Sequence, residues 1–222
     1  MSPLLLAVDT THEFGSLALA RGEQIQEELP LHAPDGFAHV IYEHLEQLLK
    51  RQDVPLGAVD CFASASGPGS FTGVRVGLAC VKGLAEACGK PAVAVSNLAA
   101  VASFGSAALR AAVLDARREE VYGAVYDASG RLVVPETVMA FGPWLATLDQ
   151  PELEFVSNDF SAFCDGFAGT RFEEARRTVV PRALAGAIAR IAHRRFLRGE
   201  TSDPAALDAN YVRRSDAELF SR

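Results

Sequence analysis

Residues 4–9, LLLAVD, and residues 112–115, AVLD, decide the fold, because each is a short apolar run that ends in an aspartate. A run of this length bounded by polar residues is typical of a fully buried strand. After each aspartate come two more strand-like runs joined by a tight turn, at residues 15–20 and 24–31 and again at residues 121–126 and 132–138. The order of strand, aspartate and hairpin therefore occurs twice.

A shift of 106 residues places Asp9 on Asp115 and Ala18-Leu19 on Ala124-Val125. Periodicity predicts further strands at residues 59–65, 92–95 and 155–157, and helices at residues 38–51, 72–88, 143–148 and 181–198, with one more ending at Ser103. The repetition predicts an α/β fold of two related lobes, a duplicated ribonuclease-H-like architecture. We expect a first lobe at residues 1–105 and a smaller second lobe at residues 106–222, whose residues 200–222 form a peripheral tail.

Composition excludes several classes of protein. Apolar residues make up 49% of the 222 residues, which is enough for a sizeable core, and the net charge is -7. Because RNA binding depends on cations that release counterions from phosphate, the chain alone is expected to bind nucleic acid poorly. The four cysteines lack metal-ligand spacing and are expected to be reduced, and no leader or membrane-spanning run is found, so we expect a cytosolic protein.

A glycine-rich loop before the helix at 72–88 is the first candidate site. Exposed N–H groups of Gly67, Gly69 and Gly73, together with the helix dipole, can hold a phosphate or carboxylate. Ser70, Thr72 and Arg75 lie beside them. However, the loop has neither Walker nor Rossmann spacing, and a glycine turn made for close packing has the same sequence. Both readings stay open.

Asp9 and Asp115 are the second candidates, because carboxylates at strand ends can hold the hydrated magnesium of a nucleotide. An aspartate in this place also caps a turn with its side-chain oxygen, as Asp9 can do for Thr10 and Thr11. His39 and His44 are five positions apart on the predicted helix, which separates them by about 140°, so they cannot chelate one ion. No metal site, nucleophile elbow or catalytic triad is predicted.

Four segments resemble the TsaB family: LLLAVDTTHEFGSLAL at 4–19, SGPGSFTGVRVGLACVKGLA at 66–85, SNLAA at 96–100 and LDARREEVYGAVYD at 114–127. Residues 211–214, YVRR, are similar to the family's terminal strand and tail. Two positions depart from the family, since Ser66 stands where many members carry Arg and Phe37 where many carry His. Any ligand contact made through those two side chains is therefore in doubt.

The resemblance implies an actin-like fold and a cytosolic, non-catalytic subunit that pairs with the transferase TsaD in making tRNA threonylcarbamoyladenosine. It also implies that the ATPase TsaE joins the pair, that TsaC supplies threonylcarbamoyl-AMP, and that tRNA is contacted only through the complex. No cofactor is required, although weak ATP or ADP binding at the candidate residues is left open. The alternatives are an autonomous ATP-using enzyme of the actin and sugar-kinase superfold, against which the absence of adjacent glycines counts, and then a metallopeptidase-like protein.

The partner surface is expected on the helices at 38–51 and 72–88, as half of a four-helix bundle. Small residues recur on the second helix at helical spacing and would admit a close partner helix. The predicted interface residues are Ile41, Leu45, Leu48, Gly73, Gly77, Cys80, Leu84 and Ala87. The alternative is that this stripe packs only internally. Without its partner, the same surface can form a homodimer.

Overall fold

The computed structural model describes residues 2–212, which form two compact units. Unit 1 contains residues 2–97 together with Arg182–Asn210, and unit 2 contains Leu98–Pro181 with Tyr211 and Val212. The first segment of unit 1 ends at Asn97, before the expected boundary at residue 105. Residues 182–210 join unit 1 and not the second lobe, because the helix at residues 185–197 packs on the first sheet. Arg213 and Arg214 of the tail motif lie outside the described residues.

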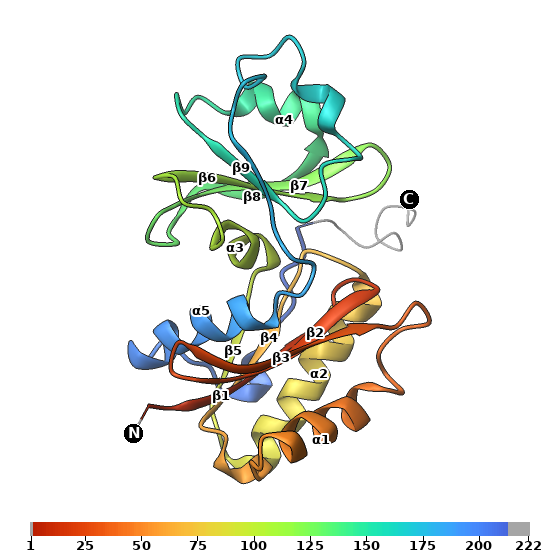
Figure 1. Cartoon of the computed structure of the whole chain (residues 1–222), viewed down its shortest axis with the longest axis vertical. Helices are drawn as coiled ribbons and strands as arrows, with labels where there is room; N and C mark the ends of the chain where they lie inside the picture. The colour runs from red at the N-terminus through yellow and green to blue at the C-terminus, as the bar shows by residue number, and fades with distance from the viewer. Residues whose placement is uncertain (1, 213–222) are drawn as a thin grey trace. The chain divides into compact units, whose positions relative to one another are not determined.

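Unit 1 is built on a five-stranded sheet with helices on both faces (Figure 1). β1 pairs antiparallel with β2 and parallel with β4, and the strand order is β3-β2-β1-β4-β5. Leu4, Leu6 and Val8 of β1 pack with α1 and α2 in one core cluster, while α5 contacts the same strand. The elements are β1 (Leu4–Asp9), β2 (Phe14–Arg21), β3 (Gln24–His32), α1 (Ile41–Arg51), η1 (Leu56–Ala58), β4 (Cys61–Ala65), α2 (Phe71–Cys88), β5 (Ala92–Val95), α5 (Ala185–Leu197) and η3 (Pro204–Ala206).

Unit 2 repeats this sheet in the order β10-β9-β6-β7-β8. Its core is a cluster of aromatic rings around Trp144 and Phe155. The elements are α3 (Asn97–Ala102, whose first residue belongs to unit 1), β6 (Leu109–Asp115), β7 (Glu120–Asp127), β8 (Leu132–Ala140), α4 (Phe141–Thr147), β9 (Glu154–Ser157), η2 (Cys164–Phe167) and β10 (Arg177–Val179).

The two sheets have the same topology. In each, the first three strands of the unit form an antiparallel meander, and the fourth and fifth lie parallel to the first, on its other side. The predicted duplicated ribonuclease-H-like fold is therefore confirmed. The shift of 106 residues holds at the aspartates but not beyond them, because Asp9 pairs with Ser16 whereas Asp115 pairs with Val121, so the second hairpin loop is one residue shorter.

Three further expectations need correction. α1 begins at Ile41, and His39 lies in the preceding turn, so the helical angle between His39 and His44 does not apply. β10 is not predicted from the sequence, because Arg177–Val179 is short, mostly exposed and not an apolar run. Residues 200–210 are not a peripheral tail: Ser202 pairs with Ala92 at the edge of β5, and Leu207 is buried in the core of unit 1.

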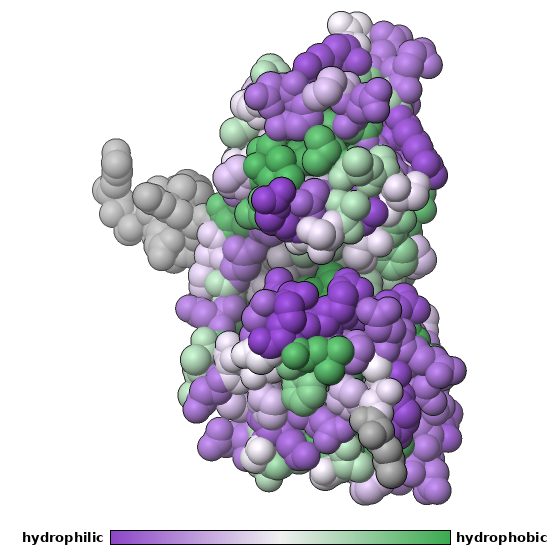
Figure 2. All heavy atoms as spheres, turned by 90° about the vertical axis from the view of Figure 1, so that its left-hand side faces the viewer, coloured by the Kyte–Doolittle hydropathy of each residue, from purple (hydrophilic) through white to green (hydrophobic). Residues whose placement is uncertain are grey.

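Hydrophilic residues predominate on the face shown in Figure 2, and the hydrophobic residues on it form separate groups. None of the helices in residues 2–212 combines the length and the apolar character that crossing a bilayer requires.

Candidate functional site

Asp9 ends β1 with its carboxylate buried, and only 1% of the residue is exposed. Its Oδ1 accepts hydrogen bonds from the Thr11 backbone N–H at 3.0 Å and from the Thr11 hydroxyl at 2.6 Å. The Thr11 hydroxyl in turn accepts a bond from the side-chain amide of Asn97 at 2.7 Å. Asp9 therefore acts as a turn cap in a buried polar network, which is the second of the two readings of its sequence.

The glycine loop at 66–70 gives its backbone donors to the protein itself. Gly67 N–H donates to Asn97 Oδ1 at 3.1 Å, and Ser70 N–H donates to the Thr11 carbonyl at 2.7 Å. Gly73 N–H donates to Ser70 Oγ at 3.3 Å, so Ser70 is the N-cap of α2. Of the three N–H groups that the sequence offered as an anion site, those of Gly67 and Gly73 already have acceptors within the protein, as does that of Ser70 between them.

The loop also lies too close to Thr10 and Thr11 to admit a phosphate between them. A Cβ added to Gly69 would be 2.6 Å from the Thr11 carbonyl oxygen, and one added to Gly73 would clash with the Thr10 carbonyl. The Thr10 hydroxyl donates to the Gly73 carbonyl at 2.7 Å. The glycines at these two positions are thus explained by close backbone packing.

The remaining candidates do not join this network. Arg75 is exposed on α2, and its guanidinium carbon lies 3.6 Å from the centre of the Phe71 ring. Asp115 belongs to unit 2, where its Oδ1 accepts the Arg117 N–H at 2.8 Å in the β6–β7 turn. Thr72 is exposed on the first turn of α2. Within unit 1, the structure brings Asp9, Thr10, Thr11, Gly67, Gly69, Ser70 and Gly73 together.

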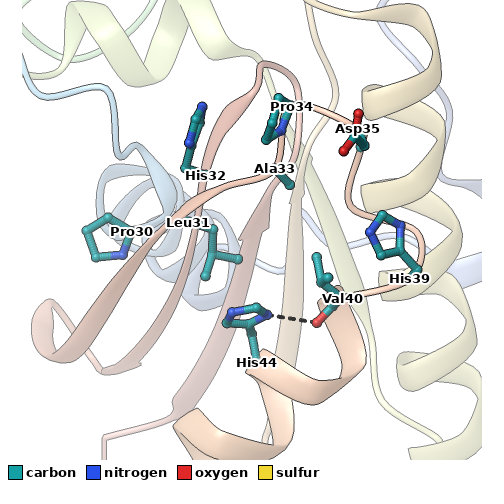
Figure 3. A pocket seen from close by; sticks show the side chains of 10 residues that line it. Pro30, Leu31, His32, Ala33, Pro34, Asp35, His39, Val40 and His44 are labelled. Carbon is teal, nitrogen blue, oxygen red and sulfur yellow. Dashed lines mark hydrogen bonds between the residues drawn. The ribbon is translucent and has the colours of Figure 1, made fainter.

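A pocket of about 270 Å³ lies where β3 leads into α1 (Figure 3). His32, His39 and His44 line it with Asp35, but their side chains come from different sides of the pocket. The Nδ1–H of His44 donates to the Val40 carbonyl at 2.8 Å. Among residues 2–212, no group of three or more His, Cys, Asp and Glu side chains is arranged to hold a metal ion. Phe37 does not line the pocket and is buried in the core of unit 1.

The predicted partner residues mostly face inward. Ile41, Leu45 and Leu48 are buried in the core of unit 1, as is Cys80. A Cβ added to Gly77 would lie 2.6 Å from the Thr10 hydroxyl, so Gly77 faces the sheet. This part of the stripe therefore packs internally, in agreement with the alternative stated above. The physical reason is that a stripe of small residues indicates close packing but not the partner to which it packs.

Another row on α2 is exposed. Phe71, Arg75, Ala79, Gly83 and Ala87 are exposed and recur every four residues, and a Cβ added to Gly83 would meet no atom within 4 Å. We call these five residues the α2 ridge. Leu84 is only partly buried beside it. The signal that could have found the ridge is the pair Ala79 and Gly83, which are small residues one helical turn apart.

Tyr42 of α1 adds an exposed aromatic side chain, with 58% of the residue accessible. Repulsion from the Cys80 thiolate, where it forms at high pH, raises the pKa of the Tyr42 hydroxyl, with further contributions from burial and from a side-chain hydrogen bond with Cys80 of α2. Burial raises the pKa of the Cys80 thiol to about 11. Since the reactive form of cysteine is the thiolate, Cys80 is a packing residue at neutral pH.

Fold and site together define a duplicated ribonuclease-H-like protein whose glycine loop is hydrogen-bonded to Asn97, Thr11 and Ser70 of the chain itself. Comparisons with known proteins agree on the relatives. The family model described as TsaD, tRNA N6-adenosine threonylcarbamoyltransferase, matches residues 25–179. A tRNA threonylcarbamoyladenosine biosynthesis protein TsaB of Bacillus subtilis is 30% identical over 96% of both chains. The chain belongs to the TsaB family.

Two further relatives support this assignment. The TsaB of Haemophilus influenzae is 40% identical over 124 residues, which are 53% of this chain and 51% of that protein. The solved structure described as YeaZ from Pseudomonas aeruginosa has a TM-score of 0.76 and 30% sequence identity, and the match covers 94% of this chain and 99% of that one.

Proposed function

We propose that this chain is a non-catalytic subunit that binds and supports the TsaD transferase during threonylcarbamoyladenosine modification of tRNA in the cytoplasm. The observation that carries the proposal is the match to a TsaB protein over 96% of both chains. The match of a TsaD family model to residues 25–179 supports a fold related to that of TsaD. Related folds would allow this chain and TsaD to pair through equivalent helices.

The absence of catalysis is proposed from the closed glycine loop. In an ATP-using relative, donors at such a loop would have to meet a phosphate. Here Gly67, Ser70 and Gly73 give their N–H groups to Asn97, Thr11 and Ser70. An autonomous ATP-using enzyme is therefore less well supported than a partner subunit, and we propose that no nucleotide or other cofactor is required.

The α2 ridge, with Tyr42 beside it, is the surface we propose for TsaD. Ala79 and Gly83 leave the helix backbone open to a close neighbour, since small residues permit short interhelical distances. Phe71 and Tyr42, which are 42% and 58% exposed, supply aromatic groups of the kind that dominate interface energies. The same ridge can form a homodimer that TsaD displaces, and we propose that TsaE joins the pair and that tRNA is held only by the complex.

The test is co-purification of cognate TsaD with Gly83→Arg. Because the added side chain points into open space, we expect the variant to keep its circular dichroism spectrum. Binding to TsaD should weaken at least about thirtyfold, equivalent to about 2 kcal/mol, since a bulky charge would be buried in the interface. Gly142→Arg on α4 is the matched control, because a Cβ there also meets nothing within 4 Å. Unchanged pairing of Gly83→Arg would remove the ridge as the interface.

A further inference from the structure

Ser66 and Gly67 are bonded to two residues that are distant in sequence. Gly67 and Asn97 are joined twice, since Gly67 N–H donates to Asn97 Oδ1 at 3.1 Å and Asn97 N–H donates to the Gly67 carbonyl at 2.8 Å. Asn210 N–H donates to the Ser66 carbonyl at 2.8 Å. The loop thus connects three parts of the chain within unit 1.

Both partners of the loop stand where the chain leaves unit 1. Asn97 is the last residue of the first segment of that unit and Asn210 is the last residue of the second. Each exit is therefore fixed to the same dipeptide. These contacts, which lie within unit 1, restrain the ends of both of its segments.

The segment before Asn210 is itself held along α2. Ser202 and Ala92 exchange backbone hydrogen bonds at 2.9 and 3.1 Å near the end of α2, and Lys82 Nζ donates to the Ala205 carbonyl at 3.3 Å. Leu207 is buried in the core that α2 also joins. We call residues 202–210 the strap. It runs beside α2 from β5 to the glycine loop.

Two features favour glycine at position 67, one in the backbone of the loop and one in the contact with the strap. The φ of Gly67 is +98°, a region that side chains disfavour, and an added Cβ would lie 3.3 Å from the Asn210 carbonyl oxygen. Three residues later Ser70 caps α2, and the α2 ridge begins with Phe71. The position of the loop therefore sets where the first turn of α2 begins.

We propose that Ser66 and Gly67 form a clasp that holds both chain exits of unit 1, and that the closed clasp fixes the first turn of α2 for partner binding. The loop has the glycines expected of an anion site, but here they form the contacts that hold the two chain exits. The clause on partner binding rests on the proposed function, whereas the clasp itself concerns the isolated chain.

Amide hydrogen exchange of the isolated protein tests the clasp. Asn210→Pro removes the N–H that donates to the Ser66 carbonyl, and Asn210→Ala, which keeps this N–H, is the control. We expect exchange at Gly67 and Ser70 to rise about tenfold in Asn210→Pro, because local opening no longer has to break that bond. Exchange at Leu6 in β1 and at Val113 in β6 should stay unchanged. Asn97→Ala should have the same local effect.

Three results would overturn the clasp. The first is unchanged exchange at Gly67 and Ser70 in both Asn210→Pro and Asn97→Ala. The second is an equal rise in exchange in Asn210→Ala, and the third is a rise in Asn210→Pro that extends to Leu6. A global rise in Asn97→Ala alone would leave Asn210→Pro to decide, since Asn210→Pro differs from its control Asn210→Ala by the loss of the backbone N–H. Binding to cognate TsaD is measured in parallel. We expect about tenfold weaker binding by Asn210→Pro than by Asn210→Ala, and equal binding would overturn the link to α2. If the wild-type chain fails to pair, the proposed function fails, and the exchange experiment still tests the clasp.

Discussion

Gly123 in β7 illustrates how one missing Cβ positions a large side chain. A Cβ added there would lie 2.6 Å from Trp144 Cζ2, and Trp144 is fully buried among the aromatic rings of unit 2. The indole therefore packs directly on the strand backbone, as aromatic rings do over glycines in sheets. Since this is the sole tryptophan of the chain, its fluorescence reports on unit 2.

We predict that Gly123→Ala destabilises unit 2 by about 1–3 kcal/mol, because the ring has no space into which to move. The measurement is urea unfolding followed by Trp144 fluorescence. Gly142→Ala on α4 is the control, since its Cβ meets no atom within 4 Å, and it should be neutral or stabilise by up to about 1 kcal/mol. Equal stability of the two variants would contradict the packing argument.

Glu154 is a buried carboxylate with a structural role, and 1% of the residue is exposed. Burial raises the pKa of its carboxyl group, but hydrogen bonds from Thr178, Ala107 and Ser106 and the nearby Arg176 outweigh burial, so the pKa is lowered overall. The Oε2 atom accepts the Ser106 and Ala107 N–H groups at 2.6 and 2.7 Å, which fixes the loop before β6.

A lowered pKa in the folded state means that the ionised carboxylate stabilises the fold above its unfolded pKa and that this contribution is lost as the pH falls through the folded value. We therefore predict that the stability of unit 2 decreases as the pH drops below about 4.5, the ordinary value for Glu. Glu154→Gln should lose about 1–3 kcal/mol at pH 7 and show a weaker dependence on acid. An acid dependence identical to that of the wild type would exclude Glu154 as its source.

At the scale of elements, α5 is capped by residues from strands that precede it by more than 150 positions. Leu184 and Ala185 donate their N–H groups to Ser16 Oγ at 3.1 and 2.9 Å, and Gly186 donates to Glu28 Oε1 at 2.9 Å. A hydroxyl and a carboxylate at a helix N-terminus accept hydrogen bonds from the first backbone N–H groups, and the negative charge of the carboxylate interacts favourably with the positive end of the helix dipole. α5 thus completes unit 1 only after the chain has returned from unit 2.

We predict that Ser16→Ala lowers the stability of unit 1 by about 1–2 kcal/mol, because two buried N–H groups lose their acceptor. Denaturant unfolding monitored by far-ultraviolet circular dichroism measures this change. Ser106→Ala is the control, since Ser106 is exposed and only its backbone N–H is bonded. A loss for Ser16→Ala no larger than that of the control would show that the cap contributes little.

Strands and helices could be predicted because their signals are local. The two aspartates mark the ends of β1 and β6, and a 3.6-residue period marks α2. The direction in which a small residue faces could not be predicted, since Gly77 and Gly83 look alike in sequence although one meets Thr10 and the other meets no atom. The return of α5 and the strap to unit 1 was also missed, because it depends on contacts between distant parts of the chain.

At the scale of the whole molecule, the two sheets share one topology, but the equivalent aspartates in them have different structural roles. Asp9 and Asp115 occupy equivalent strand ends, yet the first closes the glycine loop network and the second shapes a hairpin turn. Neither is arranged with a group of metal ligands among residues 2–212. In the proposed partner's role, the exposed α2 ridge matters more than any side chain at the strand ends.

The most direct test is the amount of threonylcarbamoyladenosine formed in tRNA by purified cognate TsaD, TsaC and TsaE with and without this chain. We predict no product from this chain alone, product when it is added to TsaD and the other components, and little product with Gly83→Arg, whereas Asp9→Asn and Asp115→Asn that remain folded should support the reaction. Modification by the isolated chain that is lost in Asp9→Asn or Asp115→Asn would contradict the account, and so would a yield from TsaD that is the same with and without this chain.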